Sequence, residues 1–467
     1  MASTAIKDPE MTVEQFDSDD VLAQKVDRLA DMVRNSQHFV AFTGAGISTS
    51  AGIPDFRGPT GKWTREAQGL KPLKGVSIVD AYPTSAHMAL LELYRRGVLK
   101  YLISQNCDGL HRRSGFPASG ISELHGNCWV EICEDCGQQF FRDFKCNRRI
   151  KEGGAKNPTD HFTGRFCYCS GRLLNSTIDF GQSLPEMPLT RARQHSRGAD
   201  LHLAMGSSLN VQPACSQPEI TAAKGGTLVI CNLQKTPLTN MAALHIYAKT
   251  DTVMEMLMER LCIPIPTFRL LRRVVMGRTE SPGQVYLKAV DAHDPTVQVE
   301  HVAAIDWQGD GAPQEVVQNP MAAVSQQQGM LHRVQRSNSC EVAPKLYFMG
   351  HYHEPPLDLK VNLSNTAAVD IKLSFDPYTS VWEVLSQQDV PDGKLAAPAD
   401  AVEARIPDYG TSNREYCIKM VMKSRDCDEK AAEEVIRKRF EDSKREALGA
   451  ANCSLRKRSP ARTNRSG

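Results

Sequence analysis

The 467-residue sequence has few aromatic residues, little net charge and no long apolar run. Aromatic side chains make up 6% of the chain, and the formal net charge is +2. This balance excludes a protein-wide field that would attract a polyanion. No stretch reaches the roughly 20 apolar residues that a membrane helix needs. We find no internal repeat, secretory signal or Arg-rich transit peptide, so we expect a soluble intracellular protein of two or more domains with no membrane partner.

The 14 cysteines are too sparse in so long a chain for a disulfide scaffold, so some are expected to be metal ligands or small buried apolar residues. Cys133 and Cys136 form a C-x-x-C pair, and Cys167 and Cys169 form a C-x-C pair further along. Four thiolates suit a closed structural zinc site that organises a polar module, here expected at about 127–176. The C-x-C spacing is irregular, so three other residues stay open as a replacement ligand: Cys128, Cys146 and His161.

A glycine-rich segment follows a short apolar run and is the most informative part of the sequence. Residues 38–42 suit a buried parallel strand, and Gly44 and Gly46 let the backbone turn sharply beside a ligand. Ser48 and Thr49 are expected to cap the following helix. A strand, a glycine turn and a helix start present backbone N–H groups to an anion, which predicts a pyrophosphate site. The Gly-Ile-Pro-Asp-Phe-Arg sequence at 52–57 adds a stiff turn, an aromatic ring and a guanidinium to the same pocket.

Short apolar strands alternate with helical patterns over the first half of the chain. Helical spacing covers residues 21–35 and 87–95, and strands are expected at 38–42, 99–104, 201–205 and 227–231. This alternation predicts an α/β fold with a Rossmann-like parallel sheet, whose ligands bind at the carboxyl ends of the strands. Small or amide residues follow three of those ends, at 105–106, 206–208 and 232–234.

Two ionisable side chains lie near these strand ends. Asp108 follows the amide pair Gln105-Asn106 and can accept a hydrogen bond from a carboxamide, while the amides can hold ribose hydroxyls or a water molecule. His125 precedes a glycine at the edge of the cysteine-rich module. An imidazole that titrates near neutrality can take a proton from a sugar hydroxyl, so His125 is a candidate general base.

The C-terminal part of the chain follows a different pattern. Apolar and polar residues alternate at 297–302, 357–363, 369–375 and 416–421, which predicts an antiparallel, sandwich-like β domain. Loops are expected at 319–328 and 390–401, and a charged helix at 428–448. The cluster His351-Tyr352-His353-Glu354 lacks metal spacing, and we expect it in an exposed loop. This domain shows no chemistry of its own, and a partner-binding role is the simplest expectation.

The motifs of the first half occur in the order found in sirtuins. They are Gly-Ala-Gly-Ile-Ser at 44–48, Gly-Ile-Pro-Asp-Phe-Arg-Gly-Pro at 52–59, Gln-Asn-x-Asp-Gly-Leu-His at 105–111, Glu-Leu-His-Gly-Asn at 123–127, the paired cysteines, Gly-Ser-Ser and Asn-Leu-Gln. The chain therefore resembles sirtuins, which are NAD-dependent protein deacylases, over about residues 20–266. The run at 58–64 and the long cysteine loop resemble the class IV branch, which holds the sixth and seventh mammalian sirtuins.

The resemblance implies a role for each matching residue. His125 would be the general base and Asn106 a second catalytic residue, with zinc held by Cys133, Cys136, Cys167 and Cys169. The segment 179–182 would clamp an extended acyl-lysine peptide. The implied NAD-binding residues run from the pyrophosphate turn to the adenosine end: Gly44, Ala45, Gly46, Thr49, Asp55, Phe56, Arg57, Trp63, Gln105, Asn106, Asp108, His125, Gly206, Ser207, Ser208, Asn232, Leu233 and Gln234.

The implied activity is NAD-dependent deacetylation of protein lysines, which releases nicotinamide and O-acetyl-ADP-ribose. Two alternatives stay open: transfer of ADP-ribose to protein, and a non-enzymatic, NAD-sensing chromatin adaptor. Histone tails are the expected substrates. The basic segment 456–460 favours residence in the nucleus and a weak, salt-sensitive contact with DNA.

The sequence divides into an N-terminal tail at 1–20, the catalytic domain at 21–266, the β-rich domain at 270–425 and a charged helix and basic tail at 426–467. Two positions depart from the sirtuin pattern. Cys107 stands where the family more often has isoleucine or valine beside the nicotinamide. The C-x-C pair makes the fourth zinc ligand less certain than the third.

Overall fold

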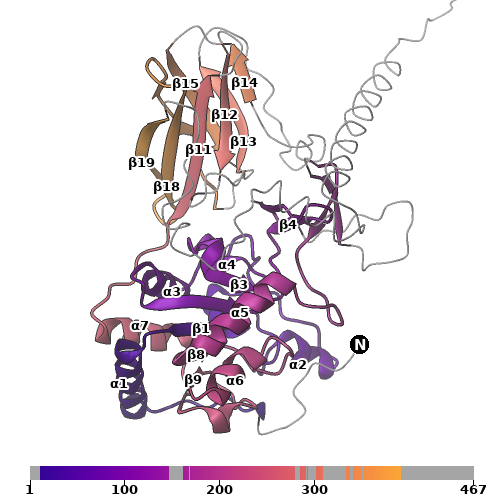
Figure 1. Ribbon diagram of the computed structural model, residues 1–467, viewed down its shortest axis with the longest axis vertical. Helices are drawn as coiled ribbons and strands as arrows, with labels where there is room; N and C mark the ends of the chain where they lie inside the picture. Colours follow the sequence, from indigo (N-terminus) through magenta and orange to yellow (C-terminus); the bar gives the residue numbers. More distant parts are fainter. Residues whose placement is uncertain are drawn as a thin grey trace, which may run out of the picture.

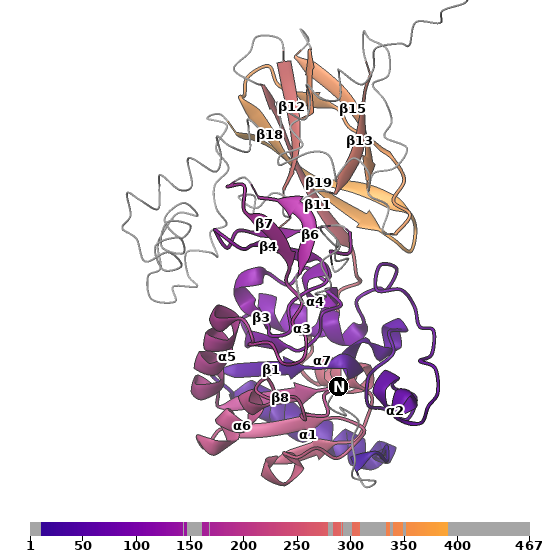
Figure 2. The same cartoon turned by 90° about the vertical axis from the view of Figure 1, so that its right-hand side faces the viewer.

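The computed structural model describes residues 11–142, 144–146, 161–167, 169–278, 284–290, 292, 301–308, 333–336, 340–348 and 352–390. The described chain forms three parts, which Figures 1 and 2 show from two sides. A helix-covered sheet lies at the bottom of both views, a small module around β4 lies beside it, and a β-sandwich stands at the top. Every helix in the described ranges is too short or too polar to cross a membrane.

The helix-covered part is built on one parallel sheet of six strands, in the order β10-β9-β8-β1-β2-β3. The strands are β1 (Phe39–Thr43), β2 (Leu99–Ser104), β3 (Ile121–Glu123), β8 (Leu201–Met205), β9 (Thr227–Cys231) and β10 (Leu244–Ile246). The prediction of a Rossmann-like parallel sheet is confirmed. Apolar runs without alternation mark such strands because helices cover both faces.

Successive residues of β1 face opposite layers of helices. Phe39 and Ala41 belong to a core shared with α1 (Asp19–Asn35), α3 (Ser85–Arg95) and α7 (Thr250–Arg260). Val40 and Phe42 belong to a second core, to which α5 (Glu186–Gly198) contributes. The remaining short helices are α2 (Lys62–Ala67), α4 (Leu110–Arg113), α6 (Ser216–Ala223) and the 3-10 helices η2 (Ala45–Ala51), η3 (Ala118–Gly120) and η4 (Thr239–Met241).

Local sequence explains where two helices of the first layer, α1 and α3, begin. Asp19 and Asp20 occupy the first turn of α1, where negative charge interacts favourably with the helix dipole. In α3, the Thr84 side chain accepts from the backbone N–H of His87, and the His87 side chain accepts from the backbone N–H of Thr84. This reciprocal capping satisfies two N–H groups that a helix start otherwise leaves unpaired.

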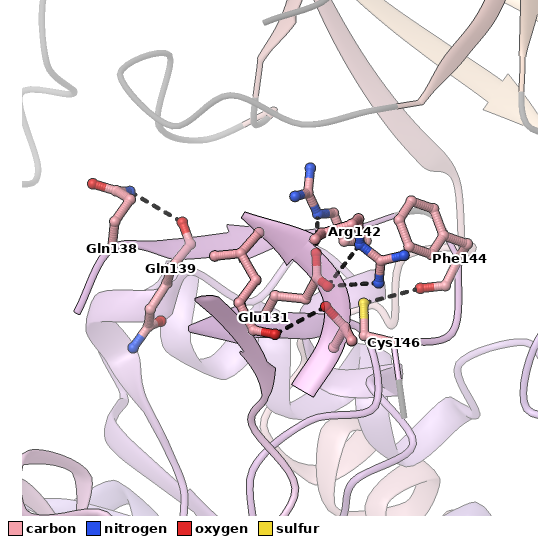
Figure 3. Close-up of polar contacts among 9 residues, drawn as sticks. Glu131, Gln138, Gln139, Arg142, Phe144 and Cys146 are labelled. Carbon is pink, nitrogen blue, oxygen red and sulfur yellow. Dashed lines mark hydrogen bonds and ion pairs between the residues drawn. The ribbon is translucent and has the colours of Figure 1, made fainter. Parts of the chain in front are cut away.

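The small module is an antiparallel sheet in the order β5-β4-β7-β6. Its strands are β4 (Val130–Cys133), β5 (Gln139–Phe141), β6 (Phe162–Phe166) and β7 (Arg172–Asn175). Glu131 is fully buried, and the Nε atoms of Arg142 and Arg165 each donate to one of its carboxylate oxygens at 2.7 Å. Burial alone would raise the pKa of Glu131, but the two guanidinium groups lower it, so the carboxylate stays charged. Figure 3 shows Arg142 and Glu131 facing each other on this sheet.

The C-terminal part is a sandwich of two antiparallel sheets that share one apolar core. One sheet has the order β14-β12-β11-β18-β19, and in the other β15 lies between β13 and the short strands β16 and β17. The expected β-rich domain is confirmed. The strand bounds are β11 (Leu270–Arg278), β12 (Gln284–Val290), β13 (Val302–Gln308), β14 (Arg333–Arg336), β15 (Glu341–Phe348), β16 (Leu357–Asp358), β17 (Val361–Asn362), β18 (Ala368–Asp376) and β19 (Val381–Val390).

Several C-terminal predictions are changed or lie outside the described residues. The strand expected at 357–363 is two short strands. Of the strand expected at 297–302, residues 297–300 lie outside the described ranges, and Val302 is the first residue of β13. The expectations at 319–328, 391–401, 416–421 and 428–448 lie outside the described ranges. The prediction of an exposed loop at 351–354 was wrong for Tyr352 and Glu354, which are only 4% and 8% exposed. Glu354 accepts from Arg272 at 2.7 Å, and such ion pairing allows a carboxylate to be buried.

Candidate active site

A pocket of about 490 Å³ lies at the carboxyl ends of the parallel strands. The loops that follow β1 and β8 leave the sheet at neighbouring positions, since these strands pair directly while β2 lies on the other side of β1. Open α/β sheets bind ligands at such a crevice. Sixteen of the eighteen expected NAD-binding residues line this pocket: Gly44, Ala45, Gly46, Asp55, Phe56, Arg57, Trp63, Gln105, Asn106, Asp108, His125, Gly206, Ser207, Ser208, Asn232 and Gln234.

Thr49 and Leu233 are not among the lining residues. Thr49 is exposed on η2, and its hydroxyl donates to the Gly46 carbonyl at 3.0 Å. The Leu233 carbonyl instead accepts from the backbone N–H of Gln15 at 2.7 Å, so the chain on this side packs against the N-terminal segment. Both expectations of a direct NAD contact therefore lack support in the geometry.

Two glycine turns lie in close contact at the crevice. The backbone N–H of Gly46 donates to the Gly206 carbonyl at 2.8 Å. A Cβ at position 46 would lie 2.7 Å from the Gly206 Cα, so neither turn has room for a side chain. The expected caps from Ser48 and Thr49 are absent, because both residues lie inside η2, which begins after Gly44 without a side-chain cap. Ser48 instead donates to Asp108 at 2.7 Å.

Hydrogen bonds hold the polar side chains of the loop after β2 in fixed orientations. The Gln105 amide donates to the Ser207 hydroxyl at 3.0 Å, which ties the β2 loop to the β8 loop. The Asn106 amide donates to the Gly44 carbonyl at 3.0 Å. Asp108 accepts from Ser48 through one oxygen and from the backbone N–H of Leu110, at 2.9 Å, through the other. Three strand ends are thus linked before any ligand is present.

His125 is held in one tautomer by a backbone carbonyl. Its Nδ1 lies 2.9 Å from the Gln105 carbonyl oxygen, which can only accept, so Nδ1 carries the proton and Nε2 has the free lone pair. Burial lowers the pKa of His125, and the positive charge of Arg57 lowers it further, while the bond to Gln105 opposes this shift. The imidazole is therefore neutral at physiological pH and can accept a proton at Nε2.

Three aromatic rings and the Arg57 guanidinium lie together on one wall of the pocket. The rings of Phe56 and Trp63 are 4.4 Å apart, and the Arg57 guanidinium lies 4.4 Å from the Trp63 ring. Phe180, from the segment expected to clamp a peptide, packs edge-on against Trp63 at 5.4 Å. Burial lowers the pKa of Arg57 to about 10, so it remains charged at neutral pH. The pocket therefore combines an apolar cover with a positive charge that favours an anionic ligand.

The four cysteines of the two pairs converge in the small module. Their sulfur atoms lie within 4.8 Å of one another. Cys133 and Cys169 are 3.4 Å apart, and Cys136 and Cys167 are 3.5 Å apart. A tetrahedral zinc site with bonds of about 2.3 Å separates its sulfurs by about 3.8 Å, so the cluster fits one such ion.

The three alternative ligands lie elsewhere. The Cys146 thiol donates to the Phe144 carbonyl at 3.4 Å, as Figure 3 shows. His161 contacts Asn175 at 3.0 Å, and Cys128 lines the pocket.

Comparisons with known proteins identify the family. The model of the Sir2 family matches residues 70–213. The NAD-dependent protein deacetylase Sirt6 of Drosophila melanogaster is 42% identical over 258 residues, which are 55% of this chain and 81% of that protein. The chain belongs to the Sir2 family.

Other Sir2 proteins match different shares of their own length. The NAD-dependent protein deacetylase SRT1 of Arabidopsis thaliana is 39% identical over 303 residues, or 63% of this chain. The chain spans 62% of the length of that relative. A solved structure described as "Sir2-p53 peptide-NAD+" is 31% identical, with a TM-score of 0.40, and the match covers 51% of this chain and 100% of the solved one.

Sequence reasoning missed part of the Sir2 pocket. Val211, Gln212 and Pro213, which follow the glycine turn after β8, line it together with Ile78 and Ile178. A proline a few residues beyond a strand-end glycine turn was an available signal for the first group, because it indicates a loop at the ligand edge of the sheet. Ile78 carries no comparable signal, since an isolated apolar residue in a long loop is common.

Proposed function

We propose that this Sir2 protein is an NAD-dependent protein lysine deacetylase. The observation that carries the proposal is the neutral imidazole of His125, which has its Nδ1 proton bound to Gln105 and lies on the wall of a glycine-lined pocket. A base with a free Nε2 beside a site for a dinucleotide suits proton removal from a ribose hydroxyl. The Drosophila and Arabidopsis relatives are named NAD-dependent protein deacetylases, which agrees with this chemistry.

NAD would lie across the crevice between the β1 and β8 loops. The two turns would face its pyrophosphate through backbone N–H groups other than those of Gly44, Gly46 and Gly206, which already donate to carbonyl oxygens. Gln105 and Asn106 would hold the nicotinamide ribose, and Asp108 would accept from the carboxamide. Asn232 and Gln234 would lie near the adenosine end, where the Gln234 amide already donates to the Thr12 carbonyl at 2.9 Å.

When bound, NAD would supply an electrophilic anomeric carbon with nicotinamide as its leaving group, and the nucleophile would be the acyl oxygen of the acetyl-lysine. The protein contributes position and proton transfer. Phe56, Trp63 and Phe180 would cover the reacting end once the ligands are bound, and proximity would compensate for the weak nucleophilicity of an amide oxygen. His125 Nε2 takes the proton of a ribose hydroxyl, and its pKa below the ordinary value keeps it ready to do so at neutral pH.

Zinc would have a structural role in this protein. Cys133, Cys136, Cys167 and Cys169 would fill all four positions of a tetrahedral ion, so no position remains for water or substrate. The small module has only short strands and buries few large apolar residues around its cysteines. A metal that joins β4 to the turn before β7 would supply the folding energy that such a core lacks.

The substrate would be an acyl-lysine peptide, with histone tails as the proposed class, and the protein would act in the nucleus. The segment 179–182 lines the pocket and supports a peptide site there, since Gln182 bonds to the backbone N–H of Asp179 at 2.8 Å and shapes the turn. The basic segment at 456–460, outside the described residues, supports nuclear residence and a weak contact with DNA or nucleosomes. The proposed catalytic domain covers 21–266, and the described part of 1–20 packs on it through Thr12 and Gln15.

One assay separates this activity from its alternatives. The purified chain is incubated with NAD and an acetylated histone peptide, and mass spectrometry follows both peptide and protein. We expect loss of 42 Da from the peptide, as one acetyl group is about 42 Da, with nicotinamide released in equal amount. A gain of ADP-ribose on protein would favour transferase activity, and neither change would favour the adaptor.

Two variants connect the activity to the site. His125→Tyr should abolish deacetylation, because it removes the only base proposed at the ribose. His353→Tyr, the same substitution at an exposed residue of the sandwich, should leave the rate unchanged. A wild-type rate from His125→Tyr would refute the proposed mechanism.

A further inference from the structure

The sandwich inserts one tyrosine into the helix-covered part of the molecule. Tyr352 follows β15 and is 4% exposed. Its hydroxyl accepts from Arg113 Nη1 at 2.8 Å and donates to the Ala81 carbonyl at 3.0 Å. A buried phenol that accepts one hydrogen bond and donates another has a fixed orientation. Both hydrogen-bond partners of Tyr352 belong to the part of the chain that carries the pocket.

Arg113 gathers the backbone of a loop that reaches the pocket. It ends α4, and its Nη1 lies 3.1, 3.2 and 3.3 Å from the carbonyl oxygens of Ile78, Val79 and Ala81, which share its two hydrogens with the Tyr352 hydroxyl. Ile78 is a lining residue of the pocket. The Tyr352 hydroxyl is therefore two contacts away from the pocket wall, through Arg113.

The other face of Arg113 supports Asp108. Its guanidinium lies 4.3 Å from the Trp129 ring, and the Trp129 Nε1 donates to the Asp108 carbonyl at 2.7 Å. Gly109 lies so near to the indole that a Cβ there would be 2.2 Å from the Trp129 Cδ1. The stack of guanidinium on indole thus packs directly under the turn at 108–109, which bears the carboxylate proposed for the nicotinamide end.

Aromatic rings from the helix-covered part and from the segment before β11 pack around Tyr352. The Tyr82 ring lies 4.8 Å from that of Tyr352, and Phe268 lies 5.7 Å from it on another side. Tyr352, Phe268 and Phe375 belong to the same apolar core as α1, α3 and α7. Figures 1 and 2 both show the lower ends of β11 and β18 directly above this part of the molecule. The two parts are therefore joined by a continuous core, and the tyrosine has little freedom to move.

We propose that Tyr352 is a positioning residue for the nicotinamide end of the pocket, supplied by the sandwich. This rests on the proposed function. The hydroxyl holds Arg113 and the loop at 78–81 together, and so keeps Ile78 and Asp108 in place before NAD binds. Without the Tyr352 hydroxyl, the segments that carry Ile78 and Asp108 would become ordered only when NAD binds. The free energy needed to order them would weaken the affinity for NAD. His125 is held separately through Gln105, so the chemical step should change little.

The variant Tyr352→Phe tests this directly, because it removes one oxygen and keeps the ring. A hydrogen bond of this kind corresponds to about a threefold to tenfold change in an equilibrium constant. We expect the KM for NAD and the calorimetric Kd of NAD to rise by that factor, with kcat within about twofold of wild type. The KM for the acetyl-peptide should stay within about twofold.

Tyr347→Phe provides the matched control. Tyr347 lies on β15 and alternates with the core residues Leu346 and Phe348, so its ring is on the outer side of the same sheet. The control should match wild type in all four constants. If Tyr352→Phe also matches wild type, or if it lowers kcat and raises both KM values alike, the positioning role is wrong.

A double-substitution cycle shows whether Tyr352 acts through Arg113. Arg113→Lys should raise the Kd of NAD, and adding Tyr352→Phe to it should cause no further rise. Full additivity of the two effects would overturn the proposed route. The Kd of NAD is measured without turnover. An inactive wild-type protein would therefore contradict the deacetylase proposal, but the Kd values of the variants would still test the positioning role of Tyr352.

Discussion

Gly126, next to the proposed base, offers a strong test of how closely the site is built. Its φ is +73°, in the left-handed region, and a Cβ would lie 1.8 Å from the Ser176 carbonyl oxygen. Gly126→Ala must therefore move two backbone segments apart until this distance reaches at least 3.0 Å, a displacement of about 1.2 Å. The backbone N–H of Ile178, which lines the pocket, bonds to the His125 carbonyl at 3.1 Å, so either the base or the pocket wall must shift.

The size of the effect follows from two separate contributions. A left-handed conformation costs an alanine about 1–2 kcal/mol of stability. A misplacement of about 1 Å at a reacting group can lower the rate about 100-fold. Gly225→Ala isolates the first contribution: φ is +86°, and among the described residues nothing lies within 4 Å of the added Cβ. Gly225 is in the turn between α6 and β9, outside the pocket lining.

The assay is steady-state nicotinamide release with an acetyl-peptide, together with thermal unfolding. We expect kcat/KM to fall about 100-fold in Gly126→Ala and to stay within about twofold of wild type in Gly225→Ala. Both variants should lose about 1–2 kcal/mol from the left-handed conformation, and Gly126→Ala should lose more. Equal kcat/KM values for the two variants would refute the reasoning that the contact between 126 and 176 places His125.

Two further predictions concern the base and the metal. Burial lowers the pKa of His125 below its ordinary value of 6.5, so the imidazole is still mostly neutral at pH 6.5. We therefore expect kcat/KM to decline only when the pH falls through the lowered pKa. A decline of kcat/KM centred at or above pH 6.5 would contradict this. A structural zinc contributes about 10 kcal/mol to folding, so Cys169→Ser or a strong chelator should remove one zinc per chain, unfold the module and lower the unfolding temperature. Cys262→Ser, at an exposed thiol, should change none of these, and unchanged stability in metal-free protein would exclude the zinc assignment.

Short-range sequence patterns, namely apolar runs and glycine turns, predicted most of the α/β part correctly, because the fold requires these residues there. Strands buried on both faces require apolar runs, as at 201–205, and glycines are required where two turns meet, as at Gly46 and Gly206. A parallel sheet brings all its carboxyl ends to one edge. Residues that follow separate strands, such as Gln105 and Ser207, therefore meet even though nothing local indicates their contact.

The direction of individual side chains could not be obtained in the same way. Thr49 and Leu233 match the family motifs in position, yet one is exposed on η2 and the other pairs with the N-terminal segment. The tautomer of His125 depends on a carbonyl twenty residues earlier in the chain. The burial of Tyr352, which alternation and spacing placed in an exposed loop, depends on Ala81 and Arg113.

The sequence by itself determined the family, the parallel sheet, the thiol pairs and sixteen of the residues that line the pocket, because each depends on residue type and short-range spacing. Only the tertiary structure decided that Cys169 completes the sulfur cluster, that His125 presents Nε2 and that the sandwich reaches the pocket wall through Arg113. These features arise from contacts between segments far apart in the chain. The energy of such contacts depends on distance and burial, which no local pattern specifies.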